Sequence, residues 1–219
     1  MKKIESVQPK KRMKREDRDR DIAREAVDFF AEVGFDGDTR ELAKRLGVTQ
    51  SLIFRYFPTK ADLIERVYQE VYVGRWNPYW ETIIADRNSP LETRLLRLYK
   101  DYAKIALTYD WVRIFMFSGL RGEDINARYL AFLRERVLIP IAAEVRAELG
   151  LPSFDDFPLM EEEVELVWGI NARVFYFGQR LWIFKSPLKI DLDTLIEQTV
   201  ASFMVVVKEI VPKLLKNSK

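Results

Sequence analysis

The sequence predicts an all-α protein of about nine helices. Apolar residues recur every three or four positions through most of the chain, which is the period of a helix with one buried side. No Asn-Gly or Asp-Gly turn joins two runs of alternating hydrophobicity, so a β-hairpin has no support. The chain has 219 residues, 48% hydrophobic and 32% charged, which is enough for one ordinary core with a small unit attached.

The first predicted helix covers residues 18–33 and ends at Gly34, because glycine readily adopts the conformation that follows a helix. Its apolar side carries Ile22, Ala26, Phe29, Phe30 and Val33. Asp38 stands three residues before Glu41, a spacing that allows a capping box, and it opens a short helix that Gly47 ends.

Thr49 is a suitable cap for a third helix over residues 50–56. Pro58 ends this helix, because the residue before a proline is pushed out of helical geometry. A fourth helix is predicted over residues 60–84, with a bend near Pro78.

Five more helices follow, separated by segments that contain Gly and Pro. They cover residues 90–108, 110–119, 123–149, 160–184 and 191–215. Pro140 lies inside the third of these and is expected to kink it. The last two are long and apolar on more than one side, which indicates helix packing between subunits.

The composition excludes most catalytic and metal-binding chemistry. The sequence contains no Cys and no His, which removes thiol nucleophiles, imidazole bases, disulfides and the usual zinc sites. We therefore predict no enzyme, no catalytic residue, no metal and no cofactor. The alternative is a helical small-molecule-binding protein or an enzyme that relies on carboxylates, although residues 161–163 are three glutamates typical of a helix start.

The N-terminal end of the chain is basic. Residues 1–60 hold fifteen Lys or Arg and eleven Asp or Glu, an excess of four, against +2 for the whole chain. A local excess of this kind favours a polyanionic partner, and a solvated basic tail is the alternative. No apolar run follows that resembles the core of a signal peptide, and Arg173 and Arg180 interrupt the longest apolar segment. We therefore expect a cytoplasmic protein with no membrane span.

Residues 39–57 contain two short helices joined by a tight turn at Gly47, which is the arrangement of a helix-turn-helix. Apolar residues stand where its small core needs them, namely Leu42, Ala43, Val48, Ile53 and Phe57. The other side of the second helix then faces outward and suits the major groove of double-stranded DNA.

Gln50, Ser51 and Arg55 are the predicted base-reading residues. A Gln amide pairs with adenine through two hydrogen bonds, and an Arg guanidinium pairs in the same way with guanine. The predicted contacts to the phosphate backbone come from side chains near helix ends, namely Thr39, Thr49, Tyr56 and Lys60. For each single residue, a solvated surface position is the alternative.

Residues 22–63 resemble the DNA-binding domain of the TetR family of bacterial repressors. The family's characteristic positions are occupied by Ile22, Ala26, Phe30, Gly34, Phe35, Thr39, Leu42, Ala43, Gly47, Val48, Phe54, Tyr56, Phe57, Lys60 and Leu63. Phe54 stands where the family usually has Tyr, which removes a phosphate-bonding hydroxyl, and the link between Gly34 and Ala43 is one residue shorter than the common pattern. Beyond residue 65 the resemblance is one of length and helical pattern.

The resemblance implies a homodimeric repressor that binds an inverted-repeat operator and is released by a small apolar or aromatic ligand. Its two recognition helices would lie about one turn of DNA apart, ~34–36 Å, and ligand binding would spread them. The ligand cavity is expected between central helices, lined by Tyr102, Trp111, Phe115, Trp168, Asn171 and Phe175. An activator, or a regulator controlled by a protein partner, is the alternative.

The period of the last helix predicts a dimer interface. Apolar residues recur there at spacings of three and four, and the candidates are Leu195, Thr199, Phe203 and Val207. Arg113, Arg173 and Gln179 lie in otherwise apolar helices, where such side chains pair with a structural partner, reach the surface or meet an anionic ligand.

The predicted organisation has three parts. Residues 1–17 form a basic arm that adds contacts to DNA or remains a solvated tail, and residues 18–64 form the helix-turn-helix domain. Residues 65–219 form the domain for ligand binding and dimerisation.

Overall fold

The computed structural model describes residues 14–217, and these form ten continuous helical stretches and no strand. In chain order the elements are α1 (Arg15–Val33), α2 (Thr39–Arg45), α3 (Gln50–Tyr56), α4 (Lys60–Tyr68), η1 (Gln69–Val73), α5 (Tyr79–Ala85), α6 (Leu91–Ala106), α7 (Tyr109–Arg121), α8 (Ile125–Leu133), η2 (Arg134–Leu138), α9 (Ile139–Glu148), α10 (Glu161–Trp182) and α11 (Leu192–Asn217). The elements η1 and η2 are single π-helical turns that continue α4 and α8. The all-α fold expected from the sequence is confirmed.

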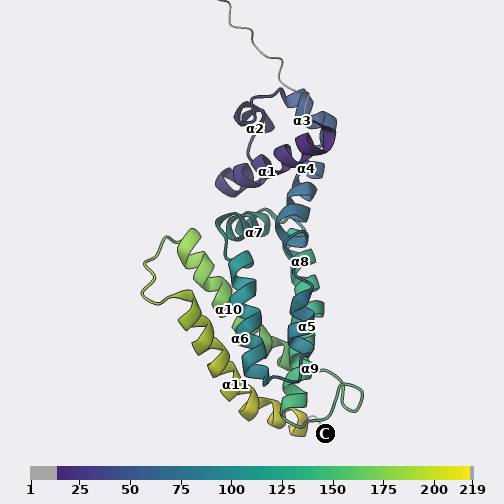
Figure 1. Ribbon diagram of the computed structural model, residues 1–219, viewed down its shortest axis with the longest axis vertical. Coiled ribbons are helices and arrows are strands. Elements are labelled where there is room, and N and C mark those ends of the chain that lie inside the picture. The colour runs from purple at the N-terminus through teal and green to yellow at the C-terminus, as the bar shows by residue number, and fades with distance from the viewer. Residues whose placement is uncertain (1–13, 218–219) are drawn as a thin grey trace, which may run out of the picture.

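The molecule is elongated, with a small helical unit at one end and a larger body below it (Figure 1). The helices α1, α2 and α3 belong to the small unit, and α4 with η1 runs from this unit into the body. Because this stretch has no break, it crosses the boundary expected at residue 64. The first thirteen residues of the expected basic arm lie outside the described residues, and α1 begins at Arg15, three residues earlier than expected.

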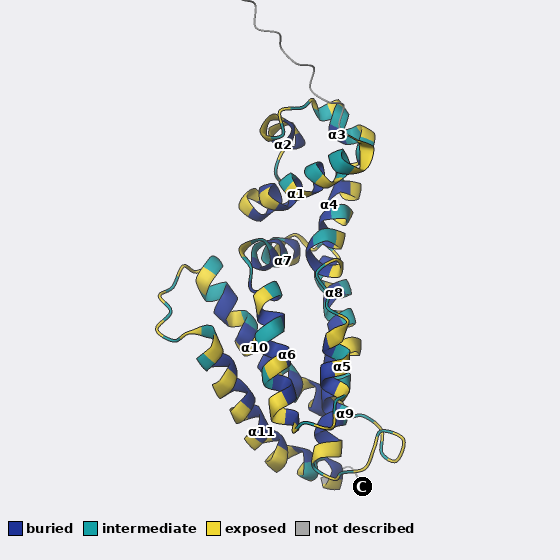
Figure 2. Cartoon of the chain, in the orientation of Figure 1, coloured by how far each residue is buried: buried dark blue, intermediate teal, exposed yellow. Residues whose placement is uncertain are grey.

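The helices pack with their buried sides facing one another (Figure 2). In the small unit α1 packs on α4, and it also packs on α7 of the body. In the body α11 packs along α10 and α6. The buried apolar side chains form one continuous cluster from Ile22 to Leu215, so a shared core joins the unit to the body.

Local signals explain where the first helices begin and end. Gly34 and Gly47 have φ values of +79° and +64°, the left-handed region in which glycine is not strained. Thr49 caps α3 by accepting a hydrogen bond from the backbone N–H of Leu52 over 3.3 Å. Asp38 caps α2 through the N–H of Arg40. A capping box is formed by Thr59 and Asp62 at the start of α4 rather than by Asp38 and Glu41.

The structure differs from the sequence-based expectation in three places. The predicted helix over 60–84 is interrupted after η1, and α5 restarts where Asn77 Oδ1 accepts a hydrogen bond from the N–H of Tyr79. Pro140, where a kink was expected, lies in the first turn of α9, which follows the π-helical turn η2 without a break. Val33, expected on the buried side of α1, is 41% exposed because it is the last residue of that helix.

None of the helices within residues 14–217 combines the length and the hydrophobicity that crossing a membrane would require.

Candidate functional site

The helix-turn-helix is held together by a small apolar core. Leu42 and Ala43 of α2 are buried, as are Ile53 of α3 and Phe57 at its end. Because these residues fix the inner side of α3, Ser51 and Arg55 are left exposed on its outer side. The helix is about two turns long, and its exposed side contains a hydroxyl and a guanidinium that can meet base edges.

Gln50 and Thr39, which the sequence assigned to base and backbone contacts, are hydrogen-bonded to each other. The Gln50 amide Nε2 donates to Thr39 Oγ1 over 2.7 Å, and Thr39 is only 6% exposed. The bond joins the start of α3 to the start of α2. It therefore fixes the angle between the two helices in the state described here.

Lys60, another predicted backbone contact, points into the small unit. Its Nζ donates to the carbonyl oxygen of Gly37 over 2.7 Å and lies 6.0 Å from the centre of the Phe30 ring. Partial burial, followed by the nearby charge of Arg121, lowers the pKa of this ammonium. Lys60 thus ties the start of α4 to the loop between α1 and α2.

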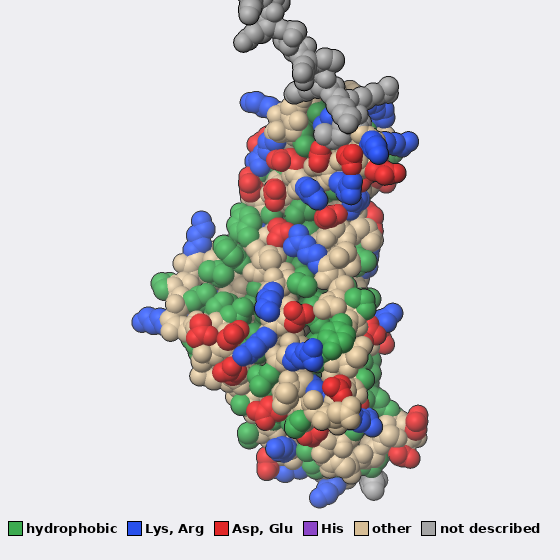
Figure 3. Space-filling view, in the orientation of Figure 1, with side chains coloured by type: hydrophobic (Ala, Val, Ile, Leu, Met, Phe, Trp, Pro, Cys, Tyr) green, Lys and Arg blue, Asp and Glu red, His purple; other side chains and the backbone are tan. Residues whose placement is uncertain are grey.

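The other predicted backbone contacts lie at the surface of the same unit. Thr49 is exposed, and Tyr56 is half-buried with the guanidinium of Arg15 6.0 Å from its ring centre. Three exposed cations on α2 were not singled out in the sequence: Arg40 and Lys44, and Arg45, which is paired with Glu32 and Glu41. The sequence indicated them only by their position on the polar side of α2. Many lysines and arginines that are merely solvated occupy such positions. Figure 3 shows positive and negative side chains interspersed over this end of the molecule.

A cavity of about 200 Å³ lies in the body, and its wall is aromatic. All six residues that the sequence proposed for a ligand cavity line it, namely Tyr102, Trp111, Phe115, Trp168, Asn171 and Phe175. They come from α6, α7 and α10, which are far apart in the sequence. Tyr129 of α8 completes the wall and was missed, because nothing in its local pattern separates it from a core tyrosine.

The rings around the cavity are packed in fixed relative orientations. Trp111 and Phe115 stack with centroids 5.1 Å apart, and Phe175 meets both of them edge-on. The hydroxyls of Tyr102 and Tyr129 are hydrogen-bonded over 2.8 Å. Burial raises the pKa of Tyr102 to about 12, against the smaller lowering effects of the neighbouring Tyr129 and Asn171 side chains, so this hydroxyl is protonated at neutral pH.

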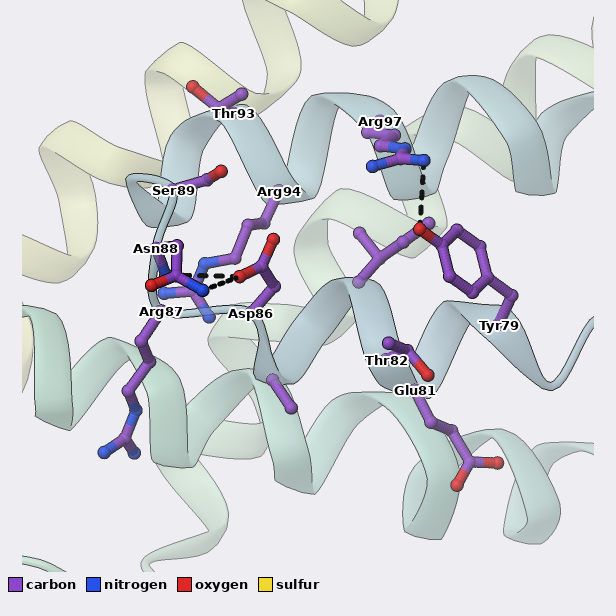
Figure 4. A pocket seen from close by; sticks show the side chains of 12 residues that line it. Tyr79, Glu81, Thr82, Asp86, Arg87, Asn88, Ser89, Thr93, Arg94 and Arg97 are labelled. Carbon is purple, nitrogen blue, oxygen red and sulfur yellow. Dashed lines mark hydrogen bonds between the residues drawn. The ribbon is translucent and has the colours of Figure 1, made fainter.

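A larger hollow of about 750 Å³ lies at the surface beside α5 and the first half of α6 (Figure 4). Several of its charged groups already have partners. Arg87 and Arg94 both bind Glu144, and these hydrogen bonds outweigh the effect of burial and lower the pKa of that carboxyl group. Figure 4 shows Arg97 bound to the hydroxyl of Tyr79. Because its charges are compensated and it is open to water, we assign no ligand to this groove.

One helix touches both the cavity and the small unit. Trp111 and Phe115 of α7 line the cavity, whereas Arg113, between them in the sequence, points the other way. The guanidinium of Arg113 donates to the backbone carbonyl oxygens of Ala31 over 2.5 Å and Glu32 over 3.0 Å at the end of α1. Arg113 is thus a structural partner of the backbone, one of the alternatives that the sequence left open.

Two further contacts join the small unit to the body. The ring of Phe117 lies so close to Gly34 that a Cβ atom there would come within 3.0 Å of it. Arg128 of α8 forms two hydrogen bonds to the carboxylate of Glu65 in α4, at 2.7 and 2.9 Å, and lies 4.0 Å above the ring of Tyr68. These contacts therefore connect α7 and α8 of the body to α1 and α4.

The residues predicted for the dimer interface need a correction. Leu195, Thr199, Phe203 and Val207 are all 9% exposed or less, because they form the side of α11 that packs inside the chain. The exposed apolar residues of α11 are Ala201, Val205, Val206 and Ile210. The spacing of three and four predicts that this helix has an apolar side, but it does not tell which apolar residues lie inside the chain and which lie at its surface.

The acidic side chains elsewhere in the described part of the chain were compared with the needs of a metal site. Within residues 14–217 there is no group of three Asp or Glu placed to hold a metal ion. Glu163, one of the three glutamates at the start of α10, is bound to Arg146 through two hydrogen bonds of 2.7 and 2.5 Å. This carboxylate therefore has a structural partner.

Comparison with known proteins agrees with this geometry. Residues 22–67 match the family model described as bacterial regulatory proteins, tetR family. No curated protein matches the chain in sequence. A solved TetR-like transcriptional regulator from Rhodococcus sp. RHA1 superposes with a TM-score of 0.66 and 13% identity, covering 90% of this chain and 100% of its own. A tetR-family transcriptional regulator from Streptomyces coelicolor gives 0.60 and 18%, with coverage of 89% and 83%.

The family model covers the helix-turn-helix, and the solved structures share the fold over 89–90% of the chain. The N-terminal unit therefore matches the DNA-binding domain of the tetR family of bacterial regulatory proteins, and the chain shares the fold of solved regulators of that family.

Proposed function

We propose that the chain is a homodimeric transcriptional repressor that binds an inverted-repeat operator and leaves it when the cavity is filled. The observation that carries the proposal is the exposed side of α3, where Ser51 and Arg55 stand on a helix held by a buried core. A short helix fixed in this way fits the major groove, and two copies related by a twofold axis read two half-sites.

In this proposal Arg55 reads a guanine and Ser51 contacts a neighbouring base edge. Gln50 reads an adenine only after its amide breaks the hydrogen bond to Thr39 and binds the base instead. Thr49 and Tyr56 contact the phosphate backbone. Lys60 does so as well once its ammonium group leaves the carbonyl oxygen of Gly37 and binds a phosphate. The exposed cations of α2, Arg40 and Lys44, add further phosphate contacts.

Release by ligand is supported by the two sides of α7. A ligand between the aromatic side chains displaces Trp111 and Phe115, and the same helix holds the end of α1 through Arg113. A shift of α7 therefore changes the position of the helix-turn-helix unit and the distance between the two α3 helices of a dimer.

The proposed dimer interface uses the outer sides of α10 and α11. Val205 is 65% exposed, and Tyr176 and Phe184 are 53% and 56% exposed, which is unusual for large apolar side chains. Figure 3 shows hydrophobic side chains gathered over α10 and the segment that follows it. A second copy that covers these residues builds a four-helix interface from α10 and α11 of each chain.

The test is selection of bound sequences from random DNA duplexes by the purified full-length chain at physiological salt. An enriched inverted repeat, with half-sites about one helical turn apart, supports the proposal. Binding that depends only on salt and not on sequence would contradict it. Transcription from the selected operator, measured with and without the protein, then separates a repressor from an activator.

A further inference from the structure

The size of the aromatic cavity limits what it can hold. It encloses about 200 Å³, which is less than the ~300–1,000 Å³ of sites for larger ligands. A dry protein cavity of about 150 Å³ is known to hold one benzene molecule. The cavity therefore has room for one substituted ring or one fused pair of rings, and not for a long acyl chain or a polycyclic ligand.

The chemistry of the wall limits the charge of its occupant. None of the residues that line the cavity is Asp, Glu, Lys or Arg. The Tyr102 hydroxyl is neutral at physiological pH, because burial raises its pKa to about 12. An ionised ligand would lose its hydration without gaining a counter-ion, which is strongly unfavourable.

One polar atom at the wall has no partner. Asn171 is 8% exposed, and its side-chain oxygen Oδ1 is buried and accepts no hydrogen bond from the described residues. The hydroxyls of Tyr102 and Tyr129 already bind each other. A buried acceptor without a donor is unfavourable, so a ligand that brings an O–H or N–H group to Asn171 would satisfy it.

We propose that the cavity binds one uncharged aromatic ring system, of the size of a substituted benzene or an indole, which donates a hydrogen bond to Asn171. The ring lies among Trp111, Phe115 and Phe175, whose faces and edges already form an aromatic enclosure. This proposal names the ligand class of the proposed function and rests on it.

The test uses ligand pairs of equal size. Phenol and toluene differ by a hydroxyl in place of a methyl group, benzoate adds a negative charge, and decanoate is a long chain. Isothermal titration of the full-length chain should show phenol binding about three- to tenfold more tightly than toluene, as one buried hydrogen bond predicts. Benzoate and decanoate should bind at least tenfold more weakly than phenol.

Two variants test whether the preference for phenol over toluene arises at Asn171. Asn171→Leu removes the acceptor at similar volume and should bring the ratio of phenol to toluene affinity to about one. Asn88→Leu, at an exposed turn outside the cavity, should leave the ratio unchanged. If Asn171→Leu does not fold, as judged by its thermal unfolding transition, Ala106→Leu is the second variant. Ala106 is 1% exposed and lines the cavity, so the added carbons should weaken indole binding more than phenol binding.

The outcomes separate this inference from the proposed function. Equal binding of phenol and toluene, tighter binding of benzoate or decanoate, or no binding of any aromatic probe would overturn the ligand class. If benzoate or decanoate binds instead and releases the chain from its operator, the proposed function stands and the ligand class is wrong. If no operator is selected while the phenol preference is present, the proposed function is wrong and the cavity assignment stands.

Discussion

The guanidinium of Arg113 in α7 lies at the C-terminal end of α1, where its Nε donates to the backbone carbonyl oxygen of Ala31 over 2.5 Å. The last carbonyls of a helix have no partner within the helix and carry the negative end of its dipole, so a cation is favourable there. One residue thus holds the DNA-binding unit against the helix that lines the cavity.

Replacing Arg113 should loosen this connection. Arg113→Met keeps the aliphatic stem but removes the donors, and we expect a loss of about 1–3 kcal/mol in the free energy of unfolding, since hydrogen bonds from a charged donor are lost. Denaturant unfolding measures the loss. Arg24→Met, at an exposed position of α1, is the control, and an equal loss in both variants would contradict the role of Arg113.

Arg55 should determine one base pair of the operator. Arg55→Ala is expected to cost about 1–3 kcal/mol on the selected site and to relax its preference at that position. Fluorescence anisotropy with single-base operator variants measures both effects. Lys44→Ala is the matched control, because loss of a phosphate contact weakens all sequences alike and reduces the salt dependence. The assignment fails if the two variants behave identically.

The pair of Arg146 and Glu163 should contribute far more to stability than a surface pair. Both side chains are at most 2% exposed, and the same guanidinium binds backbone carbonyls of the loop before α10, including those of Phe157 and Pro158. Glu163→Gln leaves the arginine without its counter-charge and should cost about 3–5 kcal/mol.

The control for this prediction is the exposed pair of Arg134 and Glu161, whose N–O distance is 2.6 Å. Glu161→Gln should change stability by about 0–1 kcal/mol because water screens the pair. Thermal or denaturant unfolding of the two variants side by side measures the difference. A loss in Glu163→Gln no greater than that in Glu161→Gln would show that burial does not matter here.

Stability should fall in strong alkali, partly through Tyr102. Its pKa is 10.0 in the unfolded chain and about 12 in the folded one, where burial opposes the phenolate. Between these values the unfolded state releases a proton that the folded state retains, so the folded state loses stability as pH rises. Below pH 10 both states are protonated and this contribution is constant.

Tyr102→Phe removes this titrating group, so the decline between pH 10 and 12 should be shallower by about 1.4 kcal/mol per pH unit. The free energy of unfolding measured at several alkaline pH values gives the slope. Tyr176→Phe, at an exposed position of α10, is the control. An unchanged slope in Tyr102→Phe would contradict the raised pKa.

Disrupting the outer side of α11 should produce a monomer. Val205→Lys places a charge at the centre of the proposed interface, where it would be buried without a partner. Sedimentation velocity should show half the mass of the native species, while the far-ultraviolet circular dichroism spectrum keeps its native helical form. Val73→Lys, at a position 47% exposed at the end of η1, should remain a dimer. A dimeric Val205→Lys variant would rule out this surface.

Helix positions in this chain follow from local signals and were predicted well. Gly34, Gly47 and Pro58 each act through backbone geometry within a few residues, so α3 was expected over residues 50–56, and these are its observed bounds. The break before α5 was harder to place; Gly74 follows η1 there, Pro78 precedes α5, and Asn77 Oδ1 accepts a hydrogen bond from the N–H of Tyr79. The helix-turn-helix could likewise be predicted from the sequence, because its core residues lie close to one another along the chain.

Contacts between distant residues were decided only by the tertiary structure. Gln50 and Lys60 remain predicted contacts to DNA, and in this structure without DNA they are bonded to Thr39 and to Gly37, partners that the fold brings near them. The last helix shows the same limit, since a stripe at spacings of three and four is apolar whether its own chain or a second copy covers it. The sequence determined the helices and their apolar sides; packing between segments far apart in the chain determined which side is core, which is surface and where the cavity lies.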